Sequence, residues 1–387
     1  MLTTPSMRSS IDNMKLIATI KLAPTQEQAM LLQDTLKRCN AACNWISERA
    51  WEHKCFQVYR LQKEVYLDVK QQFGLTAQAV VRSVKKVVDS YRRFAKKQRS
   101  FRRHAAQPYD DRIFRFCKDD VVSLWTLTGR EKIPFVCGEH QRRMLEHRQG
   151  EVELMFVRGQ WFIAAVCDID EPETFFPEGV LGVDLGIVNL ATDSDGNNYS
   201  GATIDDARRK HQHRRKNLQK KGTKSAKRKL KQVSGQQARY QRDKNHCISK
   251  AIVQNAQRSR RGIALEELTG IRDRVKARRK QRARLHNWGF AQLRSFIEYK
   301  ARLVGVPVYP VDPRNSSREC PACAHISKRN RPTRDHFSCQ SCGFAGPADH
   351  IAALNLSARA VVNRPMVGGT MQHQSPTHKP STLVEGC

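Results

Sequence analysis

Two pairs of cysteines near the end of the chain constrain its fold more than any other feature of the sequence. Cys320 and Cys323 form one Cys-x-x-Cys pair, and Cys339 and Cys342 form another, with fifteen residues between the pairs. Four thiolates at this spacing close the tetrahedral site of a zinc ribbon, which suits them better than a redox role. We therefore predict one structural Zn²⁺ here. Two histidines between the pairs could each replace a thiolate: His325 and His336.

The chain is strongly basic. Its 387 residues include 69 Lys and Arg against 37 Asp and Glu, a formal net charge of +32. This charge favours a polyanionic partner, and nucleic acid is the default because binding to its phosphates releases counterions. A ribosome-associated structural protein is the alternative that charge alone leaves open. With 39% hydrophobic residues the chain can bury a core, and its length predicts two or three domains.

Two further features bear on the compartment. Residues 1–13 are polar and lack the apolar core of a signal peptide, and no run approaches the roughly 20 apolar residues of a membrane span. The cysteines outside the two pairs are scattered, which indicates reduced and mostly buried side chains. We predict a cytoplasmic bacterial protein that acts at the nucleoid and contacts no membrane.

The first half of the chain combines strand-like and helical patterns. A strand-like run at residues 15–22 precedes a helix whose Thr25 and Gln28 fit a capping box. A later basic helix carries one apolar stripe that we predict to be buried: Val80, Val84, Val87, Val88, Tyr91 and Phe94. Four β-like runs follow, at residues 121–127, 133–137, 152–157 and 161–167. These patterns predict a β-barrel module at residues 14–24 and 99–175 that is interrupted by a helical insertion at 25–98.

The second half begins with an apolar strand that carries one acid. Because side chains alternate along a strand, Asp184 shares its face with Gly182 and Gly186, which predicts open space around the carboxylate. A second apolar strand ends in Glu266 on its small-residue face, whereas Glu267 shares the face of the bulky residues. The open space suits a hydrated metal ion and a phosphate. Taken singly, each acid could equally be an edge or turn residue.

A third acid, Asp349, begins an alanine-rich apolar run. An acid here also suits the first turn of a helix, where it interacts favourably with the helix dipole. With Asp184 and Glu266 it completes a set of three carboxylates, the hard oxygen ligands that Mg²⁺ prefers. Such a set can hold two Mg²⁺ ions for phosphodiester hydrolysis, and we predict that these three acids are catalytic.

Two basic runs lie among the acids. Residues 208–231 contain thirteen Lys or Arg and no acid, with a break near 221–225 typical of the turn of a helical hairpin, and residues 272–284 form the second run. Few aromatic residues are interleaved, which favours phosphate contacts over base stacking, although a solvated face is the alternative. We predict that these side chains contact nucleic acid: Arg208, Arg209, Lys210, Arg214, Arg215, Lys216, Lys220, Lys221, Arg278, Arg279 and Lys280.

The remaining segments carry weaker signals. Residues 286–304 predict an amphipathic helix with a stripe that we interpret as core rather than as a base-stacking platform: Trp288, Gln292, Phe296 and Tyr299. Residues 1–13 and 363–387 have no periodicity, and we predict that both are disordered.

Five segments of the second half follow a specific order of acid, basic insertion, acid, ribbon and acid. They are Gly182-Val-Asp184-Leu-Gly186, Ala264-Leu-Glu266-Glu-Leu268, His286-Asn-Trp288-Gly-Phe290 with Tyr299-Lys300, Asn315-Ser-Ser317 before the first cysteine pair, and the second pair with Gly343 before Ala348-Asp349. In this order they resemble the RuvC-type nuclease of the TnpB family, transposon-encoded relatives of the type V CRISPR effectors. The first half resembles that family only in outline.

The resemblance implies an α+β multidomain fold. Its parts would be an N-terminal β-barrel wedge domain with a helical recognition insertion, and an RNase H-like (RuvC) domain at residues 176–318 and 344–362 with a zinc ribbon inserted at 319–343. Two departures from the family pattern are Asn315-Ser-Ser in place of a threonine-serine pair and His350 where asparagine is common. Neither removes a metal ligand.

The resemblance also implies an activity. The chain would be a monomeric RNA-guided DNA endonuclease that binds a guide RNA from the transposon end and cuts double-stranded target DNA beside a short flanking motif. Asp184, Glu266 and Asp349 would hold two catalytic Mg²⁺, and the four cysteines one Zn²⁺. The alternatives are an RNA-guided repressor that binds without cutting and a transposase that acts directly on transposon ends.

Overall fold

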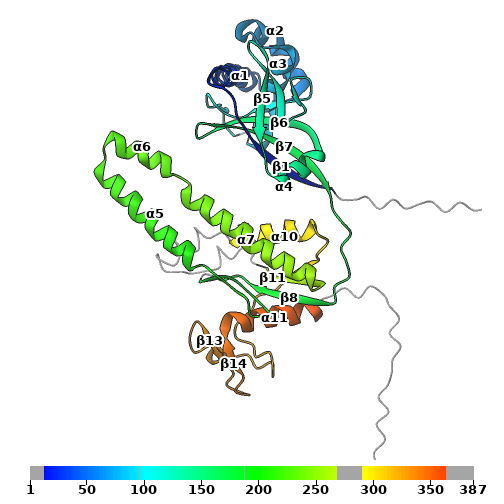
Figure 1. Cartoon of the computed structure of the whole chain (residues 1–387), viewed down its shortest axis with the longest axis vertical. Helices are drawn as coiled ribbons and strands as arrows, with labels where there is room; N and C mark the ends of the chain where they lie inside the picture. The colour runs from blue at the N-terminus through cyan, green and yellow to red at the C-terminus, as the bar shows by residue number, and fades with distance from the viewer. Residues whose placement is uncertain (1–12, 95, 187, 268–289, 363–387) are drawn as a thin grey trace, which may run out of the picture. The chain divides into compact units, whose positions relative to one another are not determined.

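The computed structural model describes residues 13–94, 96–186, 188–267 and 290–362. The chain divides into two compact units, Met1–Glu171 and Pro172–Cys387, and each is described by itself (Figure 1). Of the predicted disordered segments 1–13 and 363–387, residues 1–12 and 363–387 lie outside the described residues, as do residues 268–289, whereas Asn13 was wrongly predicted because it begins a strand. Together the units give an α+β protein.

The first unit is built around a barrel-like sheet. Its seven strands follow the order β2-β6-β7-β1-β5-β4-β3, and β1 pairs along its whole length with β7. The β-like runs of the sequence are confirmed as strands, with two short additional strands and a helix, α4 (Glu139–Glu146), that the sequence did not predict. The strands are β1 (Asn13–Leu22), β2 (Gln107–Tyr109), β3 (Phe114–Phe116), β4 (Val121–Thr126), β5 (Gly129–Val136), β6 (Arg148–Val157) and β7 (Gln160–Asp170).

Three helices lie between β1 and β2: α1 (Gln26–Glu52), α2 (Val58–Phe73) and α3 (Ala77–Arg93). The predicted capping box is confirmed. The Thr25 side chain accepts a hydrogen bond from the Gln28 backbone N–H, and the Gln28 side chain accepts one from the Thr25 backbone N–H. The apolar stripe of α3 is buried as predicted from Val80 to Tyr91. The prediction that Phe94 is buried was wrong. The helix ends at Arg93, and Phe94 is 51% exposed.

The second unit contains a five-stranded sheet in the order β10-β9-β8-β11-β12, within which β8, β11 and β12 are parallel. Helices α7 (Gln236–Arg258) and α10 (Phe290–Arg302) pack on one face, and α11 (Ala348–Val362) packs on the other (Figure 1). The sheet is therefore a buried layer between helices. The strands are β8 (Gly179–Asp184), β9 (Asn189–Asp193), β10 (Asn198–Ser200), β11 (Arg261–Glu266) and β12 (Val308–Val311).

Gly182, two residues before Asp184, does not leave open space as predicted. A Cβ at Gly182 would lie 1.9 Å from the backbone oxygen of Ala353 and 2.7 Å from the nitrogen of Ser357. The predicted open space at Gly182 is therefore wrong, because the glycine lets α11 approach β8 closely. Since α11 carries Asp349 in its first turn, this close approach brings the third acid to the strand of the first. The predicted open space is also wrong at Gly186, where a Cβ would lie 2.6 Å from the backbone oxygen of Asn189.

The long basic run forms the predicted helical hairpin, α5 (Ala202–Lys221) and α6 (Lys224–Val233). Its turn is at Gly222, whose φ of +66° is a conformation that glycine adopts without strain (Figure 1). The predicted core stripe of α10 is wrong. Leu293, Ile297 and Ala301 are the buried residues, whereas Gln292, Phe296 and Tyr299 are half-buried, and Trp288 is outside the described residues.

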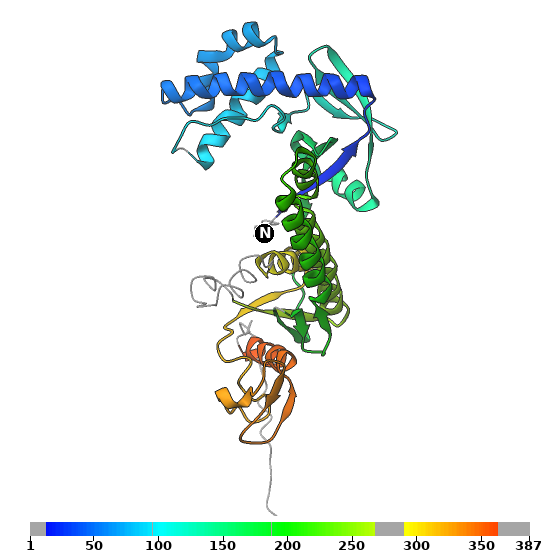
Figure 2. The same cartoon turned by 90° about the vertical axis from the view of Figure 1, so that its left-hand side faces the viewer.

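The segment between the sheet and α11 holds the four cysteines. It contains a 3₁₀ turn, η1 (Lys328–Asn330), and a hairpin of β13 (His336–Ser338) and β14 (Ala345–Pro347), which lies against α11 (Figure 2). The Asn355 amide of α11 donates to the backbone oxygens of Ser316 and Glu319, at 2.7 and 2.8 Å. Arg359 donates to the oxygens of Asp312 and Arg314. These contacts tie α11 to the chain that enters the cysteine segment.

Each helix of the described residues is too short or too polar to cross a membrane.

Candidate metal centres

Two strands and one helix place the three predicted acids in one cavity. Asp184 ends β8 and Glu266 ends β11, and because these parallel strands pair in register, Val183 beside Leu265, their acids emerge at the same edge of the sheet. Asp349 lies in the first turn of α11. All three line a cavity of about 310 Å³ with Ser316, Ser317, Arg331 and Arg334, among others.

Asp184 and Glu266 interact directly. Their carboxyl groups hydrogen-bond to each other, and Glu266 is only 8% exposed. Burial is the largest cause that raises the pKa of both groups, and the charge of Asp184 raises the pKa of Glu266 further. The raised pKa values favour a protonated carboxyl in this pair, and a divalent cation held by these acids would favour their ionised forms.

The neighbouring acid has a different environment. Glu267 accepts from the Arg294 guanidinium of α10 at 3.1 Å, on the face opposite the cavity lined by Glu266. The preference for Glu266 that strand alternation gave agrees with this placement.

Asp349 is held by two donors. The Asn189 amide donates to one carboxylate oxygen at 3.2 Å, and the Arg331 guanidinium lies 3.4 Å from the other. Arg331 also lowers the pKa of Asp184, although burial of that acid outweighs the effect. The sequence did not single out Arg331 or Arg334. Both lie in the spacer between the cysteine pairs, where an arginine has no periodic or spacing signal to mark it.

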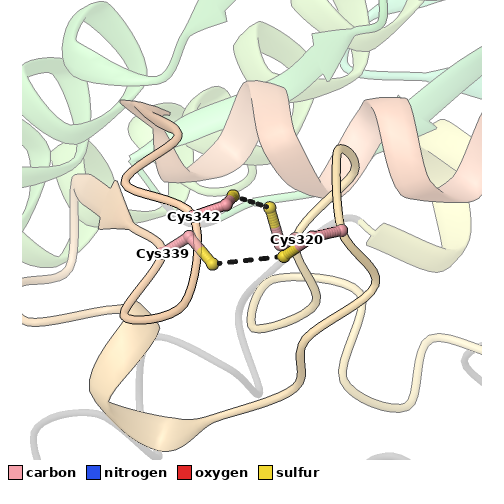
Figure 3. Close-up of side chains that lie close together, drawn as sticks. Cys320, Cys339 and Cys342 are labelled. Atoms are coloured by element: carbon pink, nitrogen blue, oxygen red, sulfur yellow. Dashed lines mark hydrogen bonds between the residues drawn. The ribbon is translucent and has the colours of Figure 1, made fainter.

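The four predicted cysteines form a compact cluster. Their sulfur atoms all lie within 4.8 Å of one another, with Cys320 to Cys342 at 3.5 Å and Cys323 to Cys339 at 3.6 Å (Figure 3). Sulfurs about 2.3 Å from a common centre would have similar separations, so the cluster fits a tetrahedral Zn²⁺. Among the residues that the structure describes, the three carboxylates are not grouped this tightly. They share a cavity and form an open site.

The surroundings of the cysteines also fit a bound cation. Burial acts to raise the pKa of Cys339, but backbone N–H groups of Cys342 and Ser341 and the neighbouring thiols lower it to about 6. Cys320 and Cys339 pack with Phe337, Ala348 and Ile351 in a small apolar cluster. The ribbon and the first turn of α11 thus share one core.

The predicted nucleic-acid residues of the hairpin lie on α5. Arg208 pairs with Asp205 at 3.1 Å and Arg209 pairs with Asp206, so these two are already neutralised in part. The others are exposed on the described helix: Lys210, Arg214, Arg215, Lys216, Lys220 and Lys221. The remaining three predicted contacts, Arg278, Arg279 and Lys280, lie outside the described residues. Six exposed cations along one helix are consistent with phosphate binding.

Two protein-family models match this chain. Residues 165–269 match a family described as "Probable transposase", and residues 290–356 match the Cas12f1-like TNB domain. The first match covers both strand acids up to Glu266, and the second covers the cysteines and Asp349.

Curated proteins with similar sequences fall into related groups. A TnpB-like protein of Methanocaldococcus jannaschii is 28% identical over 63% of this chain and 92% of its own length. InsQ of Escherichia coli is 26% identical over 73% of this chain and 74% of its own. The CRISPR-associated endodeoxyribonuclease Cas12f1 of Sulfoacidibacillus thermotolerans is 29% identical, and this chain spans only 50% of it.

Solved structures agree at the level of the fold. A complex of Cas12f1 with single guide RNA and target DNA matches with a TM-score of 0.54 and 14% identity, over 86% of this chain and 83% of that one. The mini-RNA-guided endonuclease CRISPR-Cas-phi3 matches with a TM-score of 0.55 and 11% identity, over 94% of this chain and 95% of that one.

Proposed function

This chain belongs to the TnpB family, and on that premise we propose that it is an RNA-guided endonuclease that hydrolyses target DNA at the carboxylate cavity. Endonucleases are named among its relatives, and a Cas12f1 complex with guide RNA and target DNA has a similar fold. The observation that carries the proposal is the meeting of Asp184, Glu266, Asp349 and Arg331 in one cavity.

In this proposal the second unit contains a RuvC-type site. Asp184, Glu266 and Asp349 would hold divalent cations, which would supply Lewis acidity and an activated water for phosphodiester hydrolysis. Arg331 would bind the scissile phosphate, because a guanidinium matches phosphate oxygens in both charge and geometry. Asn189 keeps Asp349 oriented into the cavity. The four cysteines would hold a structural Zn²⁺ that contributes to folding.

The nucleic acids need a cationic surface outside the cavity. We assign the exposed side chains of α5 to phosphate contacts, which position a duplex without reading its sequence. A guide RNA would supply sequence recognition by base pairing, and the first unit would take the role of the wedge and recognition domains. The proposed working state is a monomer with RNA and double-stranded DNA in the bacterial cytoplasm.

The test is cleavage of a plasmid that carries a guide-matched site, by protein purified together with its RNA. The unaltered complex should cut in the presence of Mg²⁺, and Asp184→Ala should lose cutting while RNA and target binding remain. Asp195→Ala is a matched control, because that acid lies in the same unit and pairs with Arg261 away from the cavity. Undiminished cutting by Asp184→Ala would refute the site, and target binding without breaks by the unaltered complex would favour a repressor.

A transposase is the second candidate, because residues 165–269 match the "Probable transposase" family. It predicts that the protein joins labelled transposon ends to target DNA without any RNA. Strand transfer of this kind would contradict the RNA-guided proposal, whereas RNA-dependent breaks without joining would support it.

A further inference from the structure

The cysteine segment contributes to the carboxylate cavity. Arg331 and Arg334 lie between the two cysteine pairs, and both line the cavity that holds Asp184 and Asp349. The Arg331 guanidinium donates to the backbone oxygen of Arg334 and lies 3.4 Å from Asp349. The ribbon thus supplies the cationic wall of an otherwise acidic site.

One buried side chain fixes the backbone beside Arg331. Asn330 is fully buried, and its amide donates to the backbone oxygens of Arg318 and His325, both at 2.9 Å. Its side-chain oxygen accepts from the backbone N–H of Gln340 at 3.0 Å. Arg318 and His325 flank the first cysteine pair, and Gln340 lies within the second pair. Asn330 therefore connects both arms of the four-cysteine site at the residue that precedes Arg331.

The geometry of these bonds depends on the closed ribbon. If the two cysteine arms separate, Asn330 loses its partners on one arm, and the buried polar atoms left without a hydrogen bond destabilise that arrangement. The backbone at Arg331 would then no longer be fixed relative to both cysteine pairs. A ribbon closed around its metal keeps the arms, Asn330 and Arg331 in one arrangement.

We propose that the four-cysteine ribbon is a positioning device for the carboxylate cavity, in which Asn330 holds the Arg331 guanidinium beside Asp349. This inference rests on the proposed function, since it takes the cavity as a divalent-cation and phosphate site. Arg331 has opposite effects on two ligands there. Its charge repels a divalent cation and attracts the substrate phosphate.

The opposite signs make the proposal testable. In the full zinc-loaded chain without nucleic acid, Mn²⁺ binding is measured by the loss of the free-ion electron paramagnetic resonance signal, and the part that Asp184→Ala abolishes belongs to the cavity. Arg331→Ala and Asn330→Ala should each tighten this binding by about 3- to 10-fold, because both remove the guanidinium from Asp349. In the guide-loaded complex both variants should slow cleavage by about 10-fold or more, because a charged contact to the phosphate is lost.

The double variant distinguishes positioning from general damage. If Asn330 acts through Arg331, then Asn330→Ala with Arg331→Ala should match Arg331→Ala alone in both measurements. Zinc content measured by mass spectrometry should remain one ion per chain in every variant. Asn245→Ala is the matched control, a buried asparagine of α7 that bonds Gln292 at 3.0 Å, and both measurements should be unchanged in it.

Four results would contradict the inference, and one of them would contradict the proposed function as well. Weaker Mn²⁺ binding in Asn330→Ala, or additive losses in the double variant, would mean that Asn330 only stabilises the fold, and the inference would fail while the proposed function stands. Loss of zinc from Asn330→Ala would likewise refute a role through Arg331. No Asp184-dependent Mn²⁺ binding in the unaltered chain would overturn the proposed function and this inference together.

Discussion

The two candidate metal centres of the second unit differ in how their ligands are brought together. The cysteines come from two short Cys-x-x-Cys segments, and their sulfur atoms all lie within 4.8 Å of one another. The carboxylates come from β8, β11 and α11, and they share a cavity without forming a closed cage. A closed set of four ligands is typical of a structural metal, and an open site leaves positions for substrate and water. The cysteine cluster therefore fits a structural metal, and the carboxylate cavity fits a site that is open to a ligand.

Loss of one cysteine should have the largest effect on this comparison. Cys320→Ser should lower the zinc content from one ion to none and unfold residues 319–343, because structural zinc contributes about 10 kcal/mol or more to such small modules. Cleavage should be lost with it. Zinc content and limited proteolysis check both outcomes. Cys247→Ser, at an exposed cysteine outside the ribbon, is the control. If Cys320→Ser retained zinc, another ligand such as His325 or His336 would have to complete the site.

The close approach of α11 to β8 holds Asp349 at the carboxylate centre and provides none of the cysteine ligands. Gly182→Ala would place a methyl group 1.9 Å from the Ala353 backbone oxygen, so the helix and Asp349 must shift away from Asp184. We expect a loss of about 2–4 kcal/mol in the free energy of unfolding, as for severe overpacking, and a large fall in cleavage. Urea unfolding and a zinc assay test this, and zinc should stay at one ion per chain. A matched change at Gly222, where nothing lies within 4 Å but φ is +66°, tests strain without overpacking and lies outside the ribbon.

The buried carboxyl pair predicts that stability depends on pH, through groups that lie outside the cysteine centre. Both pKa values are raised in the folded state, first by burial, so the folded protein binds a proton that the unfolded chain releases. In the metal-free protein this contribution is complete at acidic pH and is lost as the pH rises through the raised pKa values. Glu266→Gln should therefore raise the melting temperature at pH 8 and flatten its pH dependence, while it abolishes cleavage.

The neighbouring residue provides the control. Glu267→Gln removes an acid that pairs with Arg294 rather than with Asp184, so its melting temperature should stay equal or fall slightly. Thermal scans from pH 5 to pH 9 in a chelator give both curves. An unchanged or lower melting temperature for Glu266→Gln at pH 8 would mean that the pair does not hold a proton.

The smallest predicted effect concerns the surface. Charge reversal of Arg214, Arg215, Lys220 and Lys221 on α5 should weaken nucleic-acid affinity and flatten its dependence on salt, since fewer counterions are released. Both metal centres should be unaffected, as zinc content and cavity Mn²⁺ binding would show. Titrations at several salt concentrations measure the slope. The same slope in the variant and the unaltered chain would remove α5 from the phosphate-binding surface.

The sequence predicted the features whose residues lie close together along the chain. The spacing of the four cysteines predicts a metal site directly. The alternation of side chains along a strand was enough to choose Glu266 over Glu267. The capping box at Thr25 and the hairpin turn at Gly222 are equally local, and both are present. Each of these features involves residues that are close in the sequence.

Features that depend on distant packing were missed or misjudged. Gly182 was interpreted as open space because the backbone of α11, which fills that space, comes 171 residues later at Ala353. The prediction that the aromatic stripe of α10 is buried in the core was wrong. Phe296 stacks on His246 of α7, with ring centres 3.9 Å apart, whereas Leu293 and Ile297 pack in the core beside the sheet. Arg331 had no sequence signal, since its partner Asp349 lies on a separate element.

The anchoring of α11 has a consequence for shortened copies of the protein. Asp349 is at the start of the helix, but Asn355 and Arg359 fasten its later turns to residues 312–319. A gene interrupted just before the codon for Asn355 would still encode all seven candidate metal ligands. Its product would lack the clamp that aligns the last acid with the other two, so the ability to cut would disappear before any ligand was mutated.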